Sequence, residues 1–117
     1  MARFDGIRWI FSHGGGTLPF LADRIREIER FKPEIVARYP KGIVQRLTQL
    51  YCDTASASSA PQLAAITQFF PPSQILFGSD HPVVALREGF ENIEHFPMIP
   101  QARADIYRNN ALKLLAS

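Results

Sequence analysis

Two short apolar runs, each ending in a polar group, constrain the fold of this chain more than any other feature. Residues 7–12 read Ile-Arg-Trp-Ile-Phe-Ser and lead into His13 and three glycines, and residues 75–79 read Ile-Leu-Phe-Gly-Ser and lead into Asp80. A third, weaker run, Leu-Tyr-Cys-Asp-Thr, occupies 50–54. Such runs are typical of buried strands, and in a parallel α/β sheet the carboxyl ends of the strands gather at one edge, where ligands bind. We therefore expect the polar residues at the ends of the three runs to meet in space.

Helical patterns separate the three runs. Apolar residues recur at helical spacing from Leu21 to Phe31, and Pro33 interrupts that helix. Further helical stretches are expected at 34–38, 43–47, 62–70, 90–94, 101–108 and 110–115. The order strand, helix, strand, helix, strand, helices predicts parallel strands joined by right-handed crossovers. At 117 residues the chain is one domain at most, so residues 1–117 are taken as one unit.

The composition is that of an ordinary globular protein, with 46% hydrophobic and 21% charged residues. The 13 basic and 11 acidic residues are interspersed, and no basic stripe with interleaved aromatic residues points to nucleic acid. Asp5 and Arg8 interrupt the apolar residues near the start, so neither a leader nor a membrane span is expected, and the cytoplasm is the expected location. Cys52 is the only cysteine, which excludes an internal disulfide and a cysteine-based metal site.

His13 and Asp80 are the residues whose positions best fit chemistry. An imidazole titrates near neutral pH and can take or give a proton, and the glycines that follow His13 let a ligand approach the backbone. A carboxylate at the end of a strand can act as a base or ligate a metal ion. Each residue also has a structural alternative, in which His13 bonds to a neighbouring carbonyl and Asp80 caps the next helix or braces a loop. For Asp53 a structural role is favoured, and His81 and His95 are expected to be structural or exposed.

The string His-Gly-Gly-Gly at 13–16 also occurs as an oxyanion-hole segment in α/β-hydrolase esterases. Those enzymes need a Gly-x-Ser-x-Gly string at the nucleophile, and this chain has none. The glycines also lack the Gly-Lys-Ser or Gly-Lys-Thr that completes a phosphate-binding loop. Both interpretations are therefore disfavoured.

Four strings, in order, resemble the carboxyl-terminal part of an amidohydrolase-related protein. They are Ser-His-Gly-Gly-Gly-Thr-Leu-Pro-Phe at 12–20, Leu-Tyr-Cys-Asp-Thr-Ala at 50–55, Ile-Leu-Phe-Gly-Ser-Asp-His-Pro at 75–82 and Asn-Asn-Ala-Leu-Lys-Leu-Leu at 109–115. The most similar branch contains aminocarboxymuconate-semialdehyde decarboxylase and the γ-resorcylate and 5-carboxyvanillate decarboxylases. The resemblance implies an α/β fold that is part of a (β/α)8 TIM barrel. This chain would supply three parallel strands, equivalent to strands six, seven and eight, with flanking helices.

The same resemblance implies roles for three residues. His13 would act as an acid or base on a metal-bound water or on the substrate, and Asp80 would be a metal ligand that also handles protons. Arg24 would reach a substrate carboxylate in the neighbouring subunit. The implied cofactor is a divalent metal ion, with zinc favoured over manganese, and the implied substrate is a small carboxylated aromatic or muconate-like molecule that is hydrolysed or decarboxylated. His81 departs from the tyrosine common in the family's Ser-Asp-Tyr-Pro string, which leaves the substrate open.

Other parts of the family pattern are absent. The chain has three histidines, and no two are separated by a single residue, so it lacks the His-x-His pair of strand one as well as the histidine of strand five. A barrel of this kind needs about 250 residues, and three parallel strands cannot close on themselves. We therefore expect the isolated chain to be inactive and to need a complementing chain or a homo-oligomer. The alternatives are one half of a split enzyme, a truncated or fragmentary product, and a non-catalytic remnant that serves as an interaction module.

Overall fold

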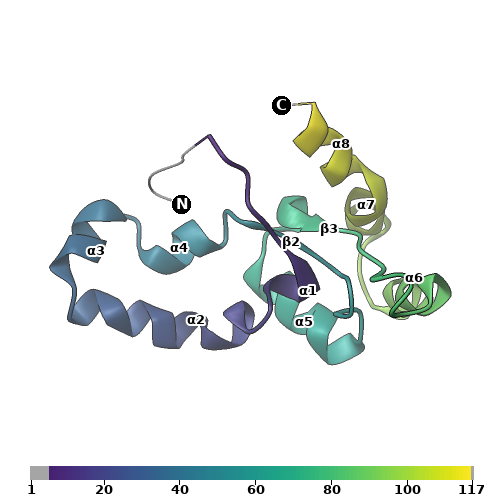
Figure 1. Cartoon of the computed structure of the whole chain (residues 1–117), viewed down its shortest axis with the longest axis horizontal. Coiled ribbons are helices and arrows are strands. Elements are labelled where there is room, and N and C mark those ends of the chain that lie inside the picture. The colour runs from purple at the N-terminus through teal and green to yellow at the C-terminus, as the bar shows by residue number, and fades with distance from the viewer. Residues whose placement is uncertain (1–5, 117) are drawn as a thin grey trace.

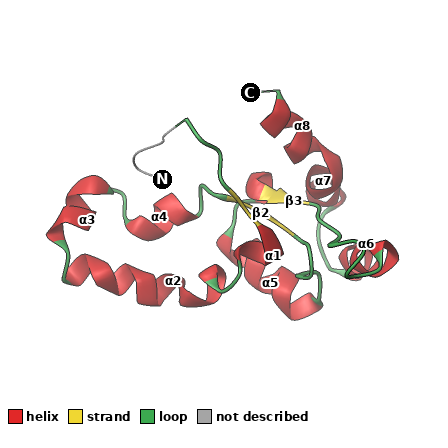
Figure 2. Ribbon diagram, in the orientation of Figure 1, coloured by secondary structure: helices red, strands yellow, loops and turns green. Residues whose placement is uncertain are grey.

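A computed structural model describes residues 6–116 of the chain. The described residues form three short strands and a series of short helices (Figures 1 and 2). In chain order the elements are β1 (Ile10–Phe11), α1 (Ser12–Gly15), α2 (Leu18–Arg26), η1 (Glu27–Arg30), α3 (Pro33–Arg38), α4 (Ile43–Leu47), β2 (Tyr51–Asp53), α5 (Ala60–Phe69), η2 (Pro72–Gln74), β3 (Ile75–Leu76), α6 (Leu86–His95), α7 (Pro100–Ala104), η3 (Asp105–Asn109) and α8 (Asn110–Leu115). None of the helices in this range combines the length and the apolar character that crossing a membrane requires.

The three strands form one parallel sheet in the order β1–β2–β3, as the alternating pattern predicts. Phe11 lies opposite Cys52, and Cys52 lies opposite Ile75. Each strand therefore pairs with the next one along the chain, which is the strand order of a (β/α)8 barrel. All three carboxyl ends point to the same rim, just beyond Phe11, Asp53 and Leu76.

The core lies on one face of the sheet, where α5 and η3 pack. Cys52 and Ile75 are 0% and 1% exposed, and they lie in a cluster with Ile66, Phe70 and Ile106. Burying one aliphatic or aromatic side chain stabilises a fold by about 1.5–3 kcal/mol. This cluster therefore holds the sheet to its helices.

The outer edge of the sheet is open. Ile10 and Phe11 of β1 are 49% and 39% exposed, and within residues 6–116 no strand pairs with the free edge of β1. An exposed apolar edge strand is a template for pairing with another segment. The structure thus agrees with the expectation that three strands leave a barrel unclosed.

The helices spread to both sides of the short sheet (Figure 1). The helices α2, α3 and α4 form an arm on one side, while α6, α7 and α8 lie on the other. The radius of gyration is 15.2 Å, compared with about 13 Å for a compact domain of this length. The molecule is therefore more extended than a closed single domain.

The sequence patterns locate the helices well but overestimate the lengths of the strands. Ser59 precedes α5 in a capping box, in which Oε1 of Gln62 accepts the Ser59 N–H at 3.2 Å. Strand β1 covers only 10–11 of the expected 7–12, because a regular ladder forms only where β2 lies alongside. Helix α6 is longer than the expected 90–94, and the pair of Arg87 and Glu91 one turn apart supports its first half.

Candidate active site

The segment after β1 is a tight left-handed turn that presents His13 at the rim. His13 and Gly14 have φ angles of 59° and 65°, in the left-handed region. Residues other than glycine rarely adopt that region, and strained positions of this kind cluster at functional sites. Gly15 and Gly16 continue the turn with φ angles of 78° and 63°. The three glycines therefore provide the turn expected from the sequence.

Asp53 holds this turn in place from the end of β2. Its Oδ1 accepts the backbone N–H of His13 at 2.9 Å and the backbone N–H of Ala55 at 3.1 Å. One carboxylate oxygen thus ties the segment after β1 to the segment after β2. The structural role expected for Asp53 is confirmed.

The imidazole of His13 is held through one of its two nitrogens. Nδ1 lies 2.9 Å from the carbonyl oxygen of Ala55. Because a carbonyl oxygen only accepts hydrogen bonds, Nδ1 carries a proton and donates it to this bond. In the neutral ring this leaves Nε2 unprotonated, with a lone pair available for a proton or a metal ion. His13 therefore makes the carbonyl contact of the structural alternative and still offers the atom that proton transfer needs.

Asp80 follows β3 in a second left-handed conformation, with a φ angle of 60°. Its Oδ2 accepts a hydrogen bond from the hydroxyl of Ser56, whose own φ angle is 47°. The backbone carbonyl of Asp80 accepts the N–H groups of Val83 and Val84 at 2.8 and 3.1 Å and closes the loop toward α6. The side chain is therefore oriented by the β2–α5 loop, and it does not cap α6.

Thr54 fixes the ends of β2 and β3 relative to each other. Its hydroxyl donates to the carbonyl oxygen of Gly78 at 3.0 Å and accepts the Gly78 N–H at 3.1 Å. A Cβ on Gly78 would lie 3.1 Å from the Cβ of Asp53 and 3.1 Å from the backbone nitrogen of Ala55. A larger residue at this position would therefore push on the loop that holds His13.

Residues 53–56 form a bridge between His13 and Asp80. One end of this segment binds the backbone and ring of His13, and its last residue binds the carboxylate of Asp80. Neighbouring strands in a sheet are about 4.8 Å apart, which puts the backbone ends of β1 and β3 about 10 Å from each other. A small aromatic ring fits between groups at that separation. Within the described residues no hydrogen bond joins the two side chains directly.

The other candidate residues lie outside this bridge. Arg24 is exposed on α2, next to apolar side chains of the same helix, and in residues 6–116 no hydrogen bond or ion pair links it to the rim. His81 and His95 are both exposed. His95 bonds through Nδ1 to the carbonyl oxygen of Glu91, one turn earlier in α6, at 2.7 Å.

Sequence reasoning missed Ser56 and the carbonyl group of Ala55. Both belong to the segment 54–61, whose Ser and Ala residues indicate only a loop. One serine among several has no spacing that marks it, and a backbone carbonyl has no sequence signature. Only the fold shows that this loop carries the partners of both candidate groups.

Cys52 contributes packing and no reactivity. Burial raises the pKa of its thiol to about 12, and the adjacent carboxylate of Asp53 adds to the rise. The side chain is 0% exposed, so the thiol stays protonated at neutral pH and is no nucleophile.

The described residues do not form a complete metal site by themselves. Within residues 6–116 no group of three His, Cys, Asp or Glu side chains could hold a metal ion, whereas stable zinc sites, for example, use three or more protein ligands. Within the described residues, Ser56 is hydrogen-bonded to Oδ2 of Asp80, and Oδ1 forms no hydrogen bond. Within residues 6–116, Oδ1 of Asp80 and Nε2 of His13 are therefore candidate ligands at the rim.

A comparison with protein families places the chain. The family model described as Amidohydrolase matches residues 1–116. The chain belongs to the amidohydrolase family. The resemblance carried by the four ordered strings is thereby confirmed.

Two similar amidohydrolase relatives are fungal enzymes. The chain is 35% identical over 79 residues to the 6-methylsalicylic acid decarboxylase of Penicillium expansum, a match that covers 68% of this chain and 24% of that protein. It is 36% identical over 85 residues to a 6-methylsalicylic acid decarboxylase of Aspergillus aculeatus, covering 70% of this chain and 26% of that protein. The chain therefore spans about a quarter of the length of the curated relatives it matches.

Solved structures share the fold over almost the whole chain. The 2,6-dihydroxybenzoate decarboxylase from Rhizobium superimposes with a TM-score of 0.78 at 20% identity, over 93% of this chain and 34% of that one. A dihydroxybenzoic acid decarboxylase from Polaromonas, solved with bound manganese, gives a TM-score of 0.79 at 20% identity, over 97% of this chain and 35% of that one. These likenesses support the α/β fold with three parallel strands, and the matched region is about a third of each solved chain.

Proposed function

We propose that this chain forms the closing part, strands six to eight, of a metal-dependent (β/α)8 decarboxylase that acts on a small carboxylated aromatic molecule. The observation that carries the proposal is the rim, where residues 53–56 hold His13 on one side and Asp80 on the other. The two curated relatives described above are decarboxylases of 6-methylsalicylic acid, which favours decarboxylation over hydrolysis. A hydroxylated benzoic acid is therefore the substrate class that we propose.

Decarboxylation of an aromatic acid exchanges a carboxylate for a hydrogen on the same ring carbon. The electrons of the broken C–C bond stay with the ring carbon, carbon dioxide leaves, and one proton must reach that carbon. At the rim, His13 could deliver this proton from Nε2 when its ring is in the doubly protonated form, and Asp80 could take part in the transfer through a carboxylate oxygen that does not bind the metal ion. The hydrogen bonds to Ala55 and Ser56 fix both side chains, so the proton would be delivered from a defined direction.

The metal ion implied by the family needs ligands from outside residues 6–116. The Polaromonas decarboxylase and a 5-carboxyvanillate decarboxylase from Novosphingobium aromaticivorans were solved with manganese, so we propose manganese where the sequence alone favoured zinc. Asp80 would supply one ligand. The others would come from a complementing chain, a second copy or a further part of a longer protein. When bound, such an ion polarises the substrate and offsets its negative charge.

Arg24 is proposed to bind a substrate carboxylate across a subunit contact. A guanidinium group pairs with a carboxylate through two parallel hydrogen bonds. Arg24 is exposed on α2 and makes no contact with the rim of its own chain within the described residues. That placement fits a role toward a second subunit.

A chimeric enzyme tests the proposed function. In the Penicillium expansum relative, the segment that matches this chain is replaced by the residues of this chain, and in a control the same segment is deleted. We expect the manganese-loaded chimera to release carbon dioxide from 6-methylsalicylate. The deletion control and the isolated chain should release none, because each lacks part of the metal site.

Two measurements make the result decisive. Thermal unfolding establishes that the chimera is folded, and elemental analysis establishes that it holds manganese. A folded, manganese-loaded chimera that leaves 6-methylsalicylate and related hydroxybenzoates intact would favour the alternative, a non-catalytic remnant.

A further inference from the structure

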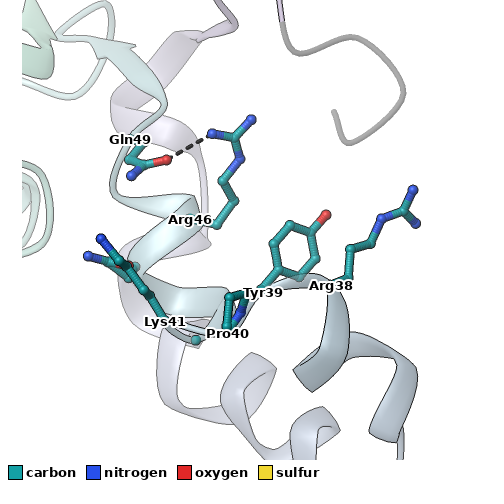
Figure 3. Close-up of a pocket in the computed structure, with 8 residues that line it drawn as sticks. Arg38, Tyr39, Pro40, Lys41, Arg46 and Gln49 are labelled. Atoms are coloured by element: carbon teal, nitrogen blue, oxygen red, sulfur yellow. Dashed lines mark hydrogen bonds between the residues drawn. The ribbon is translucent and has the colours of Figure 1, made fainter.

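A hollow of about 430 Å³ lies at the loop between α3 and α4. Six of its lining residues are polar or charged: Arg38, Tyr39, Lys41, Gln45, Arg46 and Gln49. Figure 3 shows the ring of Tyr39 between the side chains of Arg38 and Arg46, with both guanidinium groups directed to the same side of the loop as the tyrosine hydroxyl. Lys41 extends from the other side of the same loop.

The sequence segment that lines this hollow contains no acidic residue. Residues 35–52 contain three basic residues and no Asp or Glu, although the whole chain is nearly balanced at 13 basic and 11 acidic residues. Within residues 6–116, Arg38 and Lys41 form no ion pair. Glu29 is a nearby carboxylate: its Oε1 lies 3.6 Å from where a Cβ on Gly42 would stand and accepts the N–H of Ile43 at 2.6 Å, but Glu29 is not among the residues that line the hollow.

The loop that carries these side chains is held in one shape. The N–H of Gly42 donates to the carbonyl oxygen of Tyr39 at 2.8 Å, and Glu29 fixes the first residue of α4. Arg46 is positioned by Gln49, whose Oε1 accepts a hydrogen bond from Nη1 at 2.8 Å. The cationic groups thus project from an ordered turn, which lowers the entropy lost when a ligand is bound.

We propose that this hollow binds a small phosphate-bearing molecule. Arg and Lys are the side chains that recognise phosphate, the first through its planar fork and the second as a point charge. The amide groups of Gln45 and Gln49 add neutral donors, and the ring of Tyr39 offers a face for a planar group attached to the phosphate. The volume is larger than one phosphate needs, which favours an organic phosphate over the free ion.

The site is independent of the proposed decarboxylase rim. Helix α4 leads into the amino end of β2, whereas Asp53 and the bridge follow its carboxyl end. The hollow therefore lies at the opposite end of the strands from His13 and Asp80, where a bound ligand could not touch a substrate at the rim.

Titration of the isotope-labelled chain with phosphate compounds tests the proposal. Backbone amide signals of Tyr39, Gly42 and Gln45 are followed by NMR while inorganic phosphate, adenosine monophosphate or adenosine is added at constant ionic strength. We expect saturable shifts with adenosine monophosphate, weaker ones with inorganic phosphate and none with adenosine. The double variant Arg38→Gln, Arg46→Gln should weaken binding at least about tenfold, because it removes the two guanidinium groups on the same side of the loop as the Tyr39 hydroxyl.

A charge-matched variant distinguishes a specific phosphate-binding site from general electrostatic attraction between the ligand and a basic surface. Arg87→Gln, Arg108→Gln removes the same charge from exposed side chains on α6 and η3, and it should change the dissociation constant less than about twofold because exposed charges far from the site are screened. The proposal is overturned if adenosine binds as tightly as adenosine monophosphate. It is also overturned if neither phosphate compound saturates at concentrations on the order of 10 mM, or if the two double variants weaken binding equally.

Discussion

Replacing His13 by Gln in the manganese-loaded chimera is expected to lower kcat for decarboxylation about a hundredfold to ten-thousandfold, the usual contribution of a positioned acid or base. Glutamine has no group that gains and loses a proton near neutral pH. Asp80→Asn should reduce kcat by a similar factor, since the amide can still accept from Ser56 but cannot transfer a proton. Steady-state kinetics of carbon dioxide release measure both effects.

The chain contains matched controls for both substitutions. His95 makes the same kind of contact as His13, with Nδ1 at 2.7 Å from a backbone carbonyl, but it lies on α6 away from the rim. Asp105 accepts side-chain hydrogen bonds from Asn109 and Gln101, which lower the pKa of its carboxyl group. His95→Gln and Asp105→Asn should leave kcat within about twofold, as surface changes usually do. Equal losses of kcat in the rim variants and in the controls would contradict the chemical role assigned to His13 and Asp80.

Replacing Gly14 by Ala is expected to lower the free energy of unfolding by about 2–5 kcal/mol, from left-handed backbone strain and from overpacking. Gly14 has a φ angle of 65°, and a Cβ there would lie 2.6 Å from Cδ1 of Ile66 and 3.2 Å from Cβ of Ala57. Ile66 is 2% exposed and belongs to the core, so it has little room to move. Urea unfolding followed by circular dichroism measures the loss.

A double-mutant cycle separates the collision from the strain. Ile66→Val removes the methyl group that the new Cβ would meet first, and alone it should cost about 0.5–1.5 kcal/mol. The combination with Gly14→Ala should then cost about 1 kcal/mol less than the sum of the two single changes, because neighbouring residues couple. Strict additivity would show that Gly14 does not pack against α5 in the way that the structure shows.

The location of the rim could be predicted from the sequence because its signals are local. An apolar run followed by a polar residue marks the end of a buried strand, and the triple glycine after His13 marks a turn. The parallel order of the strands followed from the alternation with helices, and the sheet confirms it. The structural role of Asp53 was also foreseen.

The partners that orient the rim could not be predicted, because they depend on contacts between distant segments. Ser56 binds Asp80 across 24 positions, and Ala55 binds the ring of His13 across 42. The strand lengths were overestimated for a related reason. Hydrophobic pattern marks which residues suit a strand, whereas a ladder also needs a neighbouring strand, and β1 has one on a single side within residues 6–116.

A crystal structure of the manganese-loaded chimera, with the ion located by its anomalous scattering, tests the central claim most directly. The account predicts manganese bonded to the carboxylate of Asp80, with Nε2 of His13 facing the same cavity and residues 53–56 between them. Manganese bound away from Asp80, or an imidazole of His13 turned to the outside of the barrel, would contradict it.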